Sequence, residues 1–219
     1  MKNQITKYPI KMKYNRIVLT LVFSLFALWS SAQTVQFGVR GGSNISGESR
    51  HKYSADVSNS TDYRMGFNAG GMVNLKLSEK FDVEADVLYS MQGFKQDIHT
   101  TIEDIYDNIE VQTVTSHYLN IPIVAKYYVV NGLYVECGPQ VGFLLGRTNN
   151  KKDWSIADPY EYSKSKKVDF GIVAGLGYAI NDNFFIDARY SIGFTGTSKI
   201  YDGGKNRNIQ VSIGYLFGG

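Results

Sequence analysis

The chain has 219 residues, of which 43% are hydrophobic, and it contains 22 glycines, 16 tyrosines and one cysteine. The length suits one domain or at most two small ones. The abundance of aromatic residues argues against a disordered chain, and high glycine and tyrosine with sparse leucine and methionine argue against a helical bundle. One cysteine excludes an internal disulfide framework and any zinc or iron–sulfur site that needs several cysteines. The formal net charge is +3, and the five basic residues of the first 32 account for more than this excess.

Residues 1–32 have the layout of a secretory signal peptide. Five basic residues and no acidic ones accompany an apolar run over 17–29, and small residues follow as far as Ala32. We expect cleavage between Ala32 and Gln33, with either Met1 or Met12 as the start of translation. An uncleaved membrane anchor is the weaker alternative, because the apolar run is short for a membrane span. Subtracting the five leader residues leaves 18 basic against 20 acidic residues, so the net charge becomes −2 and no nucleic-acid surface is implied.

After the leader, apolar and polar residues alternate in segments of about ten residues. In 81–89, for example, the odd positions are apolar and the even ones are Asp82, Glu84, Asp86 and a leucine. Alternation with a period of two indicates β-strands. We predict eight strands, at 34–43, 64–77, 80–92, 117–129, 132–146, 167–180, 183–195 and 208–217.

Short and long connections alternate between the predicted strands. The short ones include Asn131-Gly132 and the asparagine-rich stretch 181–183, both of which favour tight hairpin turns. The long ones lie at 44–63, 93–116, 147–166 and 196–207. An even number of strands with short turns at one end and long loops at the other is typical of an outer-membrane β-barrel. Pro122 and Pro139 fall inside strands, where we expect bulges or a local widening of the ladder.

Alternation alone does not decide which face meets water, since a soluble barrel such as a lipocalin has its apolar face inside. Many glycines on the polar face suit a narrow eight-stranded interior. Aromatic residues of the apolar face gather in two bands, as in interfacial girdles. The long-loop band comprises Phe67, Tyr89, Tyr118, Phe143, Phe170 and Phe194, and the short-turn band Phe37, Phe81, Tyr127, Tyr178, Phe184, Tyr215 and Phe217.

Charges of both signs occupy the polar face, as expected for ion pairs that fill a lumen. We therefore predict an eight-stranded antiparallel up-and-down transmembrane barrel over residues 33–219, with a structural charge network in its interior. The predicted members are Arg40, Lys76, Asp82, Glu84, Asp86, Lys126, Glu136, Asp169, Asp187 and Arg189.

Three stretches resemble the PorT-like outer-membrane β-barrel family of Bacteroidetes-type bacteria. They are Phe81–Lys95, Tyr118–Leu145 with its Leu-Asn-Ile-Pro entry and Gly-Pro-Gln, and Asp169–Thr195 with its Ala-Arg-Tyr-Ser core. The resemblance implies an outer-membrane barrel and little about activity. The name-giving member is associated with type IX secretion and gliding motility, but none of these residues separates it from generic barrels.

No catalytic, cofactor-binding or metal-binding residues are predicted. Asp82, Glu84 and Asp86 share one face of a strand and could attract a cation, but an ion-pair network is the favoured interpretation. His51, His99 and His117 have no metal-ligand spacing, and no Gly-x-Ser-x-Gly motif is present.

We expect a non-enzymatic protein of the Gram-negative outer membrane with a structural or interaction role. Its expected partners are the lipid bilayer, lipopolysaccharide and the barrel-assembly machinery, which would read the terminal Tyr215 and Phe217. Three alternatives remain: an assembly factor for a type IX-like secretion or gliding machine, a small passive pore, and an enzyme embedded in the barrel.

Overall fold

The computed structural model describes residues 34–49, 61–102, 106–151, 166–195 and 205–218. The predicted signal peptide and its cleavage point between Ala32 and Gln33 therefore lie outside the described residues. Eight strands are present in that part of the chain: β1 Thr34–Ser49, β2 Thr61–Lys76, β3 Phe81–Ile102, β4 Tyr106–Tyr128, β5 Leu133–Lys151, β6 Val168–Ala179, β7 Phe184–Gly193 and β8 Lys205–Phe217. No helix of the described residues is long and apolar enough to cross a membrane.

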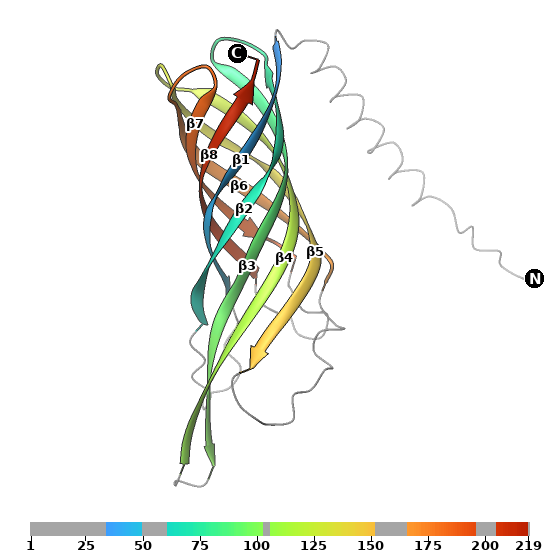
Figure 1. The fold of residues 1–219 in the computed structure, drawn as a ribbon, viewed down its shortest axis with the longest axis vertical. Coiled ribbons are helices and arrows are strands. Elements are labelled where there is room, and N and C mark those ends of the chain that lie inside the picture. Colours follow the sequence, from blue (N-terminus) through green and yellow to red (C-terminus); the bar gives the residue numbers. More distant parts are fainter. Residues whose placement is uncertain (1–33, 50–60, 103–105, 152–165, 196–204, 219) are drawn as a thin grey trace, which may run out of the picture.

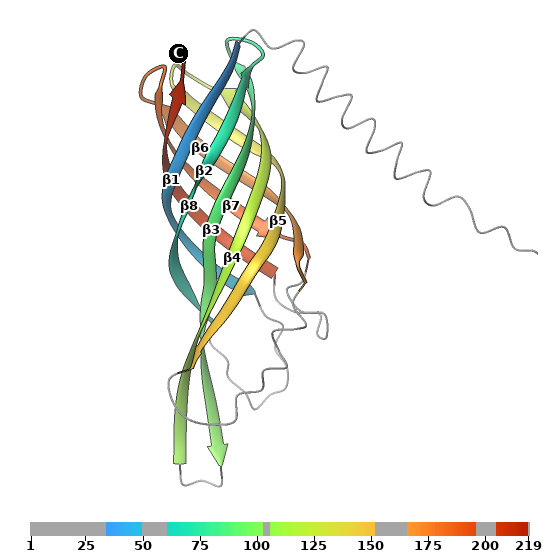
Figure 2. The ribbon, with the colours of Figure 1, turned by 45° about the vertical axis from the view of Figure 1, so that its right-hand side comes forward.

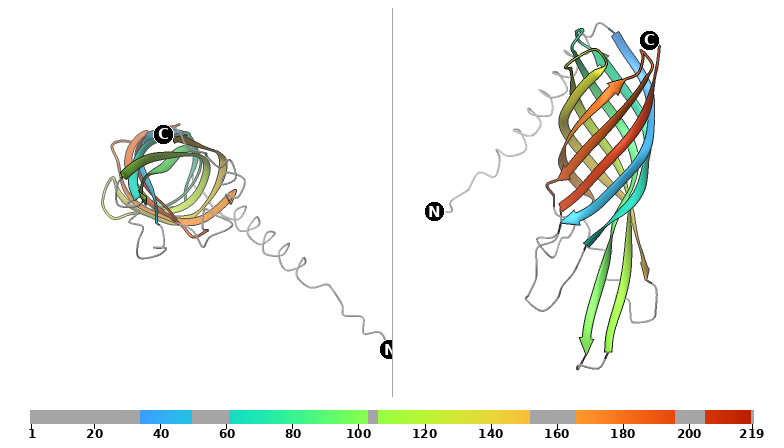
Figure 3. Two further views of the ribbon diagram at one scale, coloured as in Figure 1. Left: turned by 90° about the horizontal axis from the view of Figure 1, so that it is seen from below. Right: turned by 90° about the vertical axis from the view of Figure 1, so that its left-hand side faces the viewer.

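The eight strands form one closed antiparallel barrel in sequence order (Figure 1; Figure 3, left). Closure is made by β1 and β8, which pair from Phe37↔Phe217 to Ser49↔Lys205. The predicted fold class is thereby confirmed. Closure satisfies the backbone hydrogen bonds of both edge strands, which is a requirement for any sheet that spans lipid.

The short connections are tight turns at one end of the barrel, the end that also holds the end of β8 (Figure 1). Gly132 has φ of 81° in the β4–β5 turn, a conformation that glycine adopts without steric cost. In the β6–β7 turn, the side-chain oxygen of Asn181 accepts hydrogen bonds from the backbone N–H groups of Asn183 and Phe184, at 2.9 and 2.8 Å. We call the end of the barrel that holds these short connections the turn end, and the opposite end the loop end.

At the loop end, β3 and β4 are much longer than predicted. They pair without interruption from Gly93↔Thr115 to Ile102↔Tyr106, so the expected loop 93–116 is largely a β-ribbon that projects beyond the other strands (Figures 1 and 2). β1 and β5 also run into the predicted loops, as far as Ser49 and Lys151. The alternation of apolar and polar residues fades there, because a strand that has left the membrane no longer needs one apolar face.

The two prolines do not sit at bulges. The register between β3 and β4 is the same at Leu88↔Asn120 and at Ala85↔Ile123, on the two sides of Pro122, but the ladder is interrupted between these pairs, as expected for a local widening. Pro139 pairs in regular register with Ile172 on β6, whereas the ladder with β4 is interrupted between Pro122↔Gln140 and Ala125↔Cys137. The register shifts instead between Tyr63 and Asn68 in β2, and at His117/Tyr118, where β4 meets β5.

The barrel has an apolar outside and a polar inside. Val135, Ile186 and Phe67 are 48%, 46% and 47% exposed on the outer face, whereas Glu84 is fully buried in the interior. The prediction that Tyr118 belongs to the outer aromatic girdle is wrong. Tyr118 is buried, and its hydroxyl accepts a hydrogen bond from Asn206 at 3.2 Å. Tyr118 and Lys126 are eight positions apart on β4, and an even spacing puts both on the lumen side.

Candidate functional site

The barrel interior contains a compact group of seven charged side chains, which we call the ion cluster. Glu84 on β3 is its centre. Its carboxylate lies 3.0 Å from Arg40, 2.7 Å from Arg189 and 2.5 Å from Lys126. The cluster comprises Arg40, Glu84, Asp86, Lys126, Glu136, Asp187 and Arg189, and each member is at most 4% exposed.

Arg189 on β7 connects three carboxylates of the cluster. Its Nε and Nη2 donate to the two oxygens of Glu136, at 2.6 and 2.8 Å. Its Nη1 and Nη2 also reach Asp86 at 2.5 Å and Glu84 at 2.7 Å. Arg40 lies 3.0 Å from Asp187 and 3.2 Å from Asp86. The planar guanidinium groups with several donors suit this network, because each can serve more than one carboxylate.

Two aromatic rings close the ion cluster on the turn side. The ring of Phe185 covers Gly214, where an added Cβ would meet the ring at 2.1 Å, and Tyr134 covers Gly177 at 2.4 Å. The ammonium of Lys126 lies 4.7 Å from the centre of the Tyr134 ring and 5.0 Å from that of Phe185. Glycine is required at both positions because any side chain would displace a ring.

Three predicted members of the charge network lie apart from the ion cluster. Asp82 accepts hydrogen bonds from Asn74 and Tyr128 nearer the turn end. Lys76 is half-buried opposite Asp82 in the ladder, with no ion pair in the described part of the chain. Asp169 lies at the loop end, where it accepts from Asn206 at 2.8 Å and from the backbone N–H of Thr195 at 3.2 Å.

The lumen between the ion cluster and the loop end holds mostly neutral amides and hydroxyls, which we call the amide region. Asn44 and Gln92 both donate to the hydroxyl of Ser90, at 2.8 and 3.0 Å. Ser212 donates to Asn68 at 3.3 Å. None of these groups carries charge, so the interior has two chemically distinct parts.

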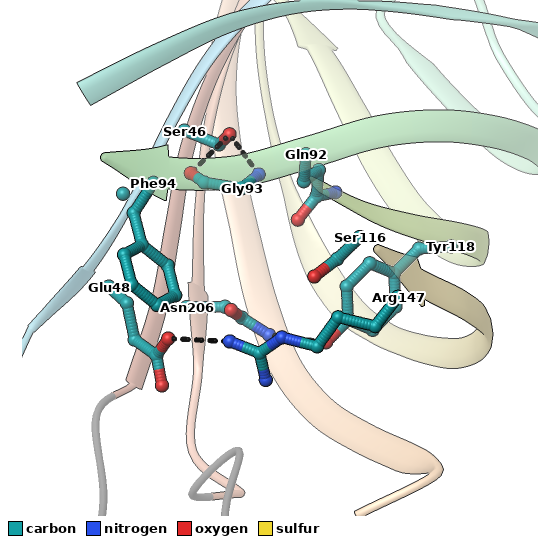
Figure 4. A pocket seen from close by; sticks show the side chains of 10 residues that line it. Ser46, Glu48, Gln92, Gly93, Phe94, Ser116, Tyr118, Arg147 and Asn206 are labelled. Carbon is teal, nitrogen blue, oxygen red and sulfur yellow. Dashed lines mark hydrogen bonds and ion pairs between the residues drawn. The ribbon is translucent and has the colours of Figure 1, made fainter. Parts of the chain in front are cut away.

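A small pocket lies where the amide region meets the loop end (Figure 4). Arg147 lies 3.4 Å from Glu48 and 5.4 Å from the centre of the Phe94 ring. The sequence analysis missed this pair because both residues fall in predicted loops. The alternation of β1 could have revealed Glu48, since it lies an even number of positions from Arg40 and so faces the lumen with it.

A larger cavity of about 830 Å³ lies at the turn end. Its lining comes from the β2–β3, β4–β5 and β6–β7 turns, and Asp82, Lys126, Tyr134 and Phe185 stand at its inner side. No sequence pattern pointed to this cavity, because it is made by turns that are distant in the chain.

Glu84, Asp86 and His117, which a metal site could have used, have protein partners instead. Among the described residues, no three His, Cys, Asp or Glu side chains are grouped so as to hold a metal ion. The carboxylates of Glu84 and Asp86 are bound by cationic side chains instead. His117 is placed beside Tyr89, whose hydroxyl lies 2.6 Å from its Nδ1.

A closed antiparallel barrel with an even number of strands, an apolar outer face and a polar interior is typical of the outer-membrane β-barrel class. Residues 31–199 match the family model described as "outer membrane protein beta-barrel domain", and the chain belongs to that family. No curated protein matches the sequence.

Solved outer-membrane barrels share the fold. OprG of Pseudomonas aeruginosa is 11% identical, with a TM-score of 0.51, over 86% of this chain and 99% of that one. Neisserial surface protein A is also 11% identical, with a TM-score of 0.52, over 84% of this chain and all of that one. Identities this low establish the common fold alone.

Proposed function

We propose that this protein is a non-enzymatic, non-conducting outer-membrane barrel that presents its loop end to the cell surface as a structural or interaction element. The observation that carries the proposal is the ion cluster. Its seven side chains are at most 4% exposed, and an eight-stranded barrel has room for little besides its side chains. The proposal includes contact of the outer face with lipid and lipopolysaccharide.

Conductance tests the filled lumen directly. In planar bilayers the purified barrel is expected to give no large, stable single-channel steps. Arg189→Ser, which removes the cation that connects three carboxylates of the ion cluster, serves as the comparison and is expected to raise the conductance. Steady openings of the unmodified protein would favour a small passive pore instead.

The orientation of the barrel is tested on intact cells. Because the number of strands is even, the start of β1 and the end of β8 both lie at the turn end. Export through the inner membrane would leave this end in the periplasm. A tag at Asn108, in the β3–β4 ribbon, is expected to be reached by antibody, whereas one at Asn181, in the β6–β7 turn, is not. Labelling of the Asn181 tag alone would mean that the barrel is inverted.

A role as assembly factor for a type IX-like secretion or gliding machine is the second candidate. It is supported by the resemblance of three sequence stretches to the PorT-like family. A deletion strain that secretes and moves normally would remove this candidate without affecting the barrel proposal.

A further inference from the structure

The turn-end cavity contains a buried carboxylate that has no ion pair. Asp82 lines the cavity and is 2% exposed. Both of its hydrogen bonds fall on one oxygen, Oδ2, which accepts from Asn74 at 3.0 Å and from Tyr128 at 3.2 Å. In the described part of the chain, Oδ1 accepts no hydrogen bond and no cation lies within ion-pair distance of Asp82.

The charges around Asp82 leave a negative excess. The ion cluster has three cations against four carboxylates, and Asp82 makes a fifth. Lys76 stands directly opposite Asp82 in the β2–β3 ladder, yet it remains half-buried without pairing to it. Because a buried charge is costly unless it is paired, this end of the lumen favours an additional cation.

The other groups of the cavity indicate what kind of cation fits. The buried side-chain oxygen of Asn74 has no hydrogen-bond partner among the described residues, so a second acceptor lies beside the carboxylate. The rim is mixed: polar turn residues such as Asn131 and Asn181 stand beside Val129, Val130 and Ile180, which also line the cavity and are 53%, 59% and 54% exposed. Acceptors at the inner end and apolar side chains at the rim match a positively charged head on an alkyl chain.

We propose that the turn-end cavity binds a primary alkylammonium group. The ammonium donates to Asp82 and Asn74, and its carbon chain lies against the apolar side chains of the rim. The same chemistry is offered by a free alkyl diamine and by a lysine side chain of a protein that approaches from the turn end. This inference goes beyond the proposed function and does not depend on whether the lumen conducts.

The test is a titration of the folded barrel in lipid nanodiscs with 1,4-diaminobutane at constant ionic strength. Backbone amide NMR signals of Asp82 and Tyr128 are expected to shift and saturate. The neutral isostere 1,4-butanediol and an equal ionic strength of KCl are expected to give no saturable shift. Equal shifts with KCl, or shifts that never saturate, would overturn the proposal.

Three variants assign the binding to this site. Asp82→Asn is expected to weaken diamine binding at least tenfold, whereas Lys76→Met, which removes the competing cation, is expected to strengthen it. Asp169→Asn, a carboxylate change at the opposite end of the lumen, serves as the matched control and is expected to leave the affinity unchanged. Unchanged affinity in Asp82→Asn contradicts the proposal. If that variant does not fold, a failure of Lys76→Met to strengthen binding contradicts it equally.

The source of the ammonium is resolved by comparing the diamine with the tripeptide Gly-Lys-Gly. Tighter binding of the diamine indicates a free amine, and tighter binding of the peptide indicates a lysine of a protein partner. Binding of neither probe overturns the proposal. The conductance of the same samples is measured separately. A barrel that conducts contradicts the proposed function, whereas absence of amine binding contradicts only the proposed cavity site.

Discussion

The ion cluster and the amide region occupy the same lumen but are connected very differently. Every charged side chain of the ion cluster has an opposite charge within 3.0 Å. Hydrogen bonding is incomplete in both regions. Among the described residues, Nε of Arg40 and Oδ1 of Asp86 in the ion cluster have no hydrogen-bond partner, and neither do the donor and the acceptor of Asn208 in the amide region.

This difference follows from the cost of leaving each group alone. An unpaired buried charge is far more costly than an unpaired buried amide. Each charge of the ion cluster therefore needs an opposite charge close to it, whereas the amides need no such partner. We conclude that the ion cluster, rather than the amide region, determines the arrangement of the lumen.

The largest expected effect comes from removing the centre of the ion cluster. Glu84→Ala leaves Lys126 without its ion-pair partner and is expected to destabilise the barrel by about 3–5 kcal/mol, the range for breaking a buried pair. Ser90→Ala, which removes one acceptor of the amide region, is expected to cost about 1 kcal/mol. Urea titration in lipid vesicles measures both, and equal costs would abolish the distinction between the two regions.

The second prediction tests whether the apolar outer face of the barrel, which surrounds both regions, contacts lipid. Val135 and Ile186 are exposed on the outer face beside ion-cluster residues. Replacing either with arginine is expected to cost about 2–4 kcal/mol near the bilayer midplane. Gln140→Arg, at a lumen position that is only half-buried, is expected to cost much less in the same titration. If both faces responded equally, the assignment of outside and inside would be wrong.

A smaller effect compares one glycine from each region. Gly177→Ala places a methyl group 2.4 Å from the Tyr134 ring, whereas Gly142→Ala meets the side-chain oxygen of Asn120 at 2.8 Å. The ring is rigid and the amide end can rotate, so we expect about 1–3 kcal/mol for Gly177→Ala, as for overpacking, and less for Gly142→Ala. The midpoints of urea unfolding measure the difference. A larger cost at Gly142 would show that the amide region is the more tightly packed.

Much of the barrel follows from local rules that a sequence shows directly. The side chains of a strand alternate between two faces, so the inward direction of Arg40, Glu84 and Arg189 was predictable from their neighbours. The tight turn at Asn131-Gly132 was predictable from its residue types. The same local rule, applied consistently along β4, would also have placed Tyr118 inside with Lys126.

Other features depend on how the sheet closes, and the sequence alone did not determine them. Glu84 and Arg189 lie 105 positions apart and meet only because the closed barrel brings β3 and β7 to face each other across a narrow lumen. Alternation places Asp82 on the same face as Glu84, yet only Glu84 joins the ion cluster, because height along the barrel decides which cations are within reach. Whether a side chain points inward or outward follows from its neighbours in the strand. Which side chains meet across the lumen depends on the register of all eight strands, and only the tertiary structure decides that register.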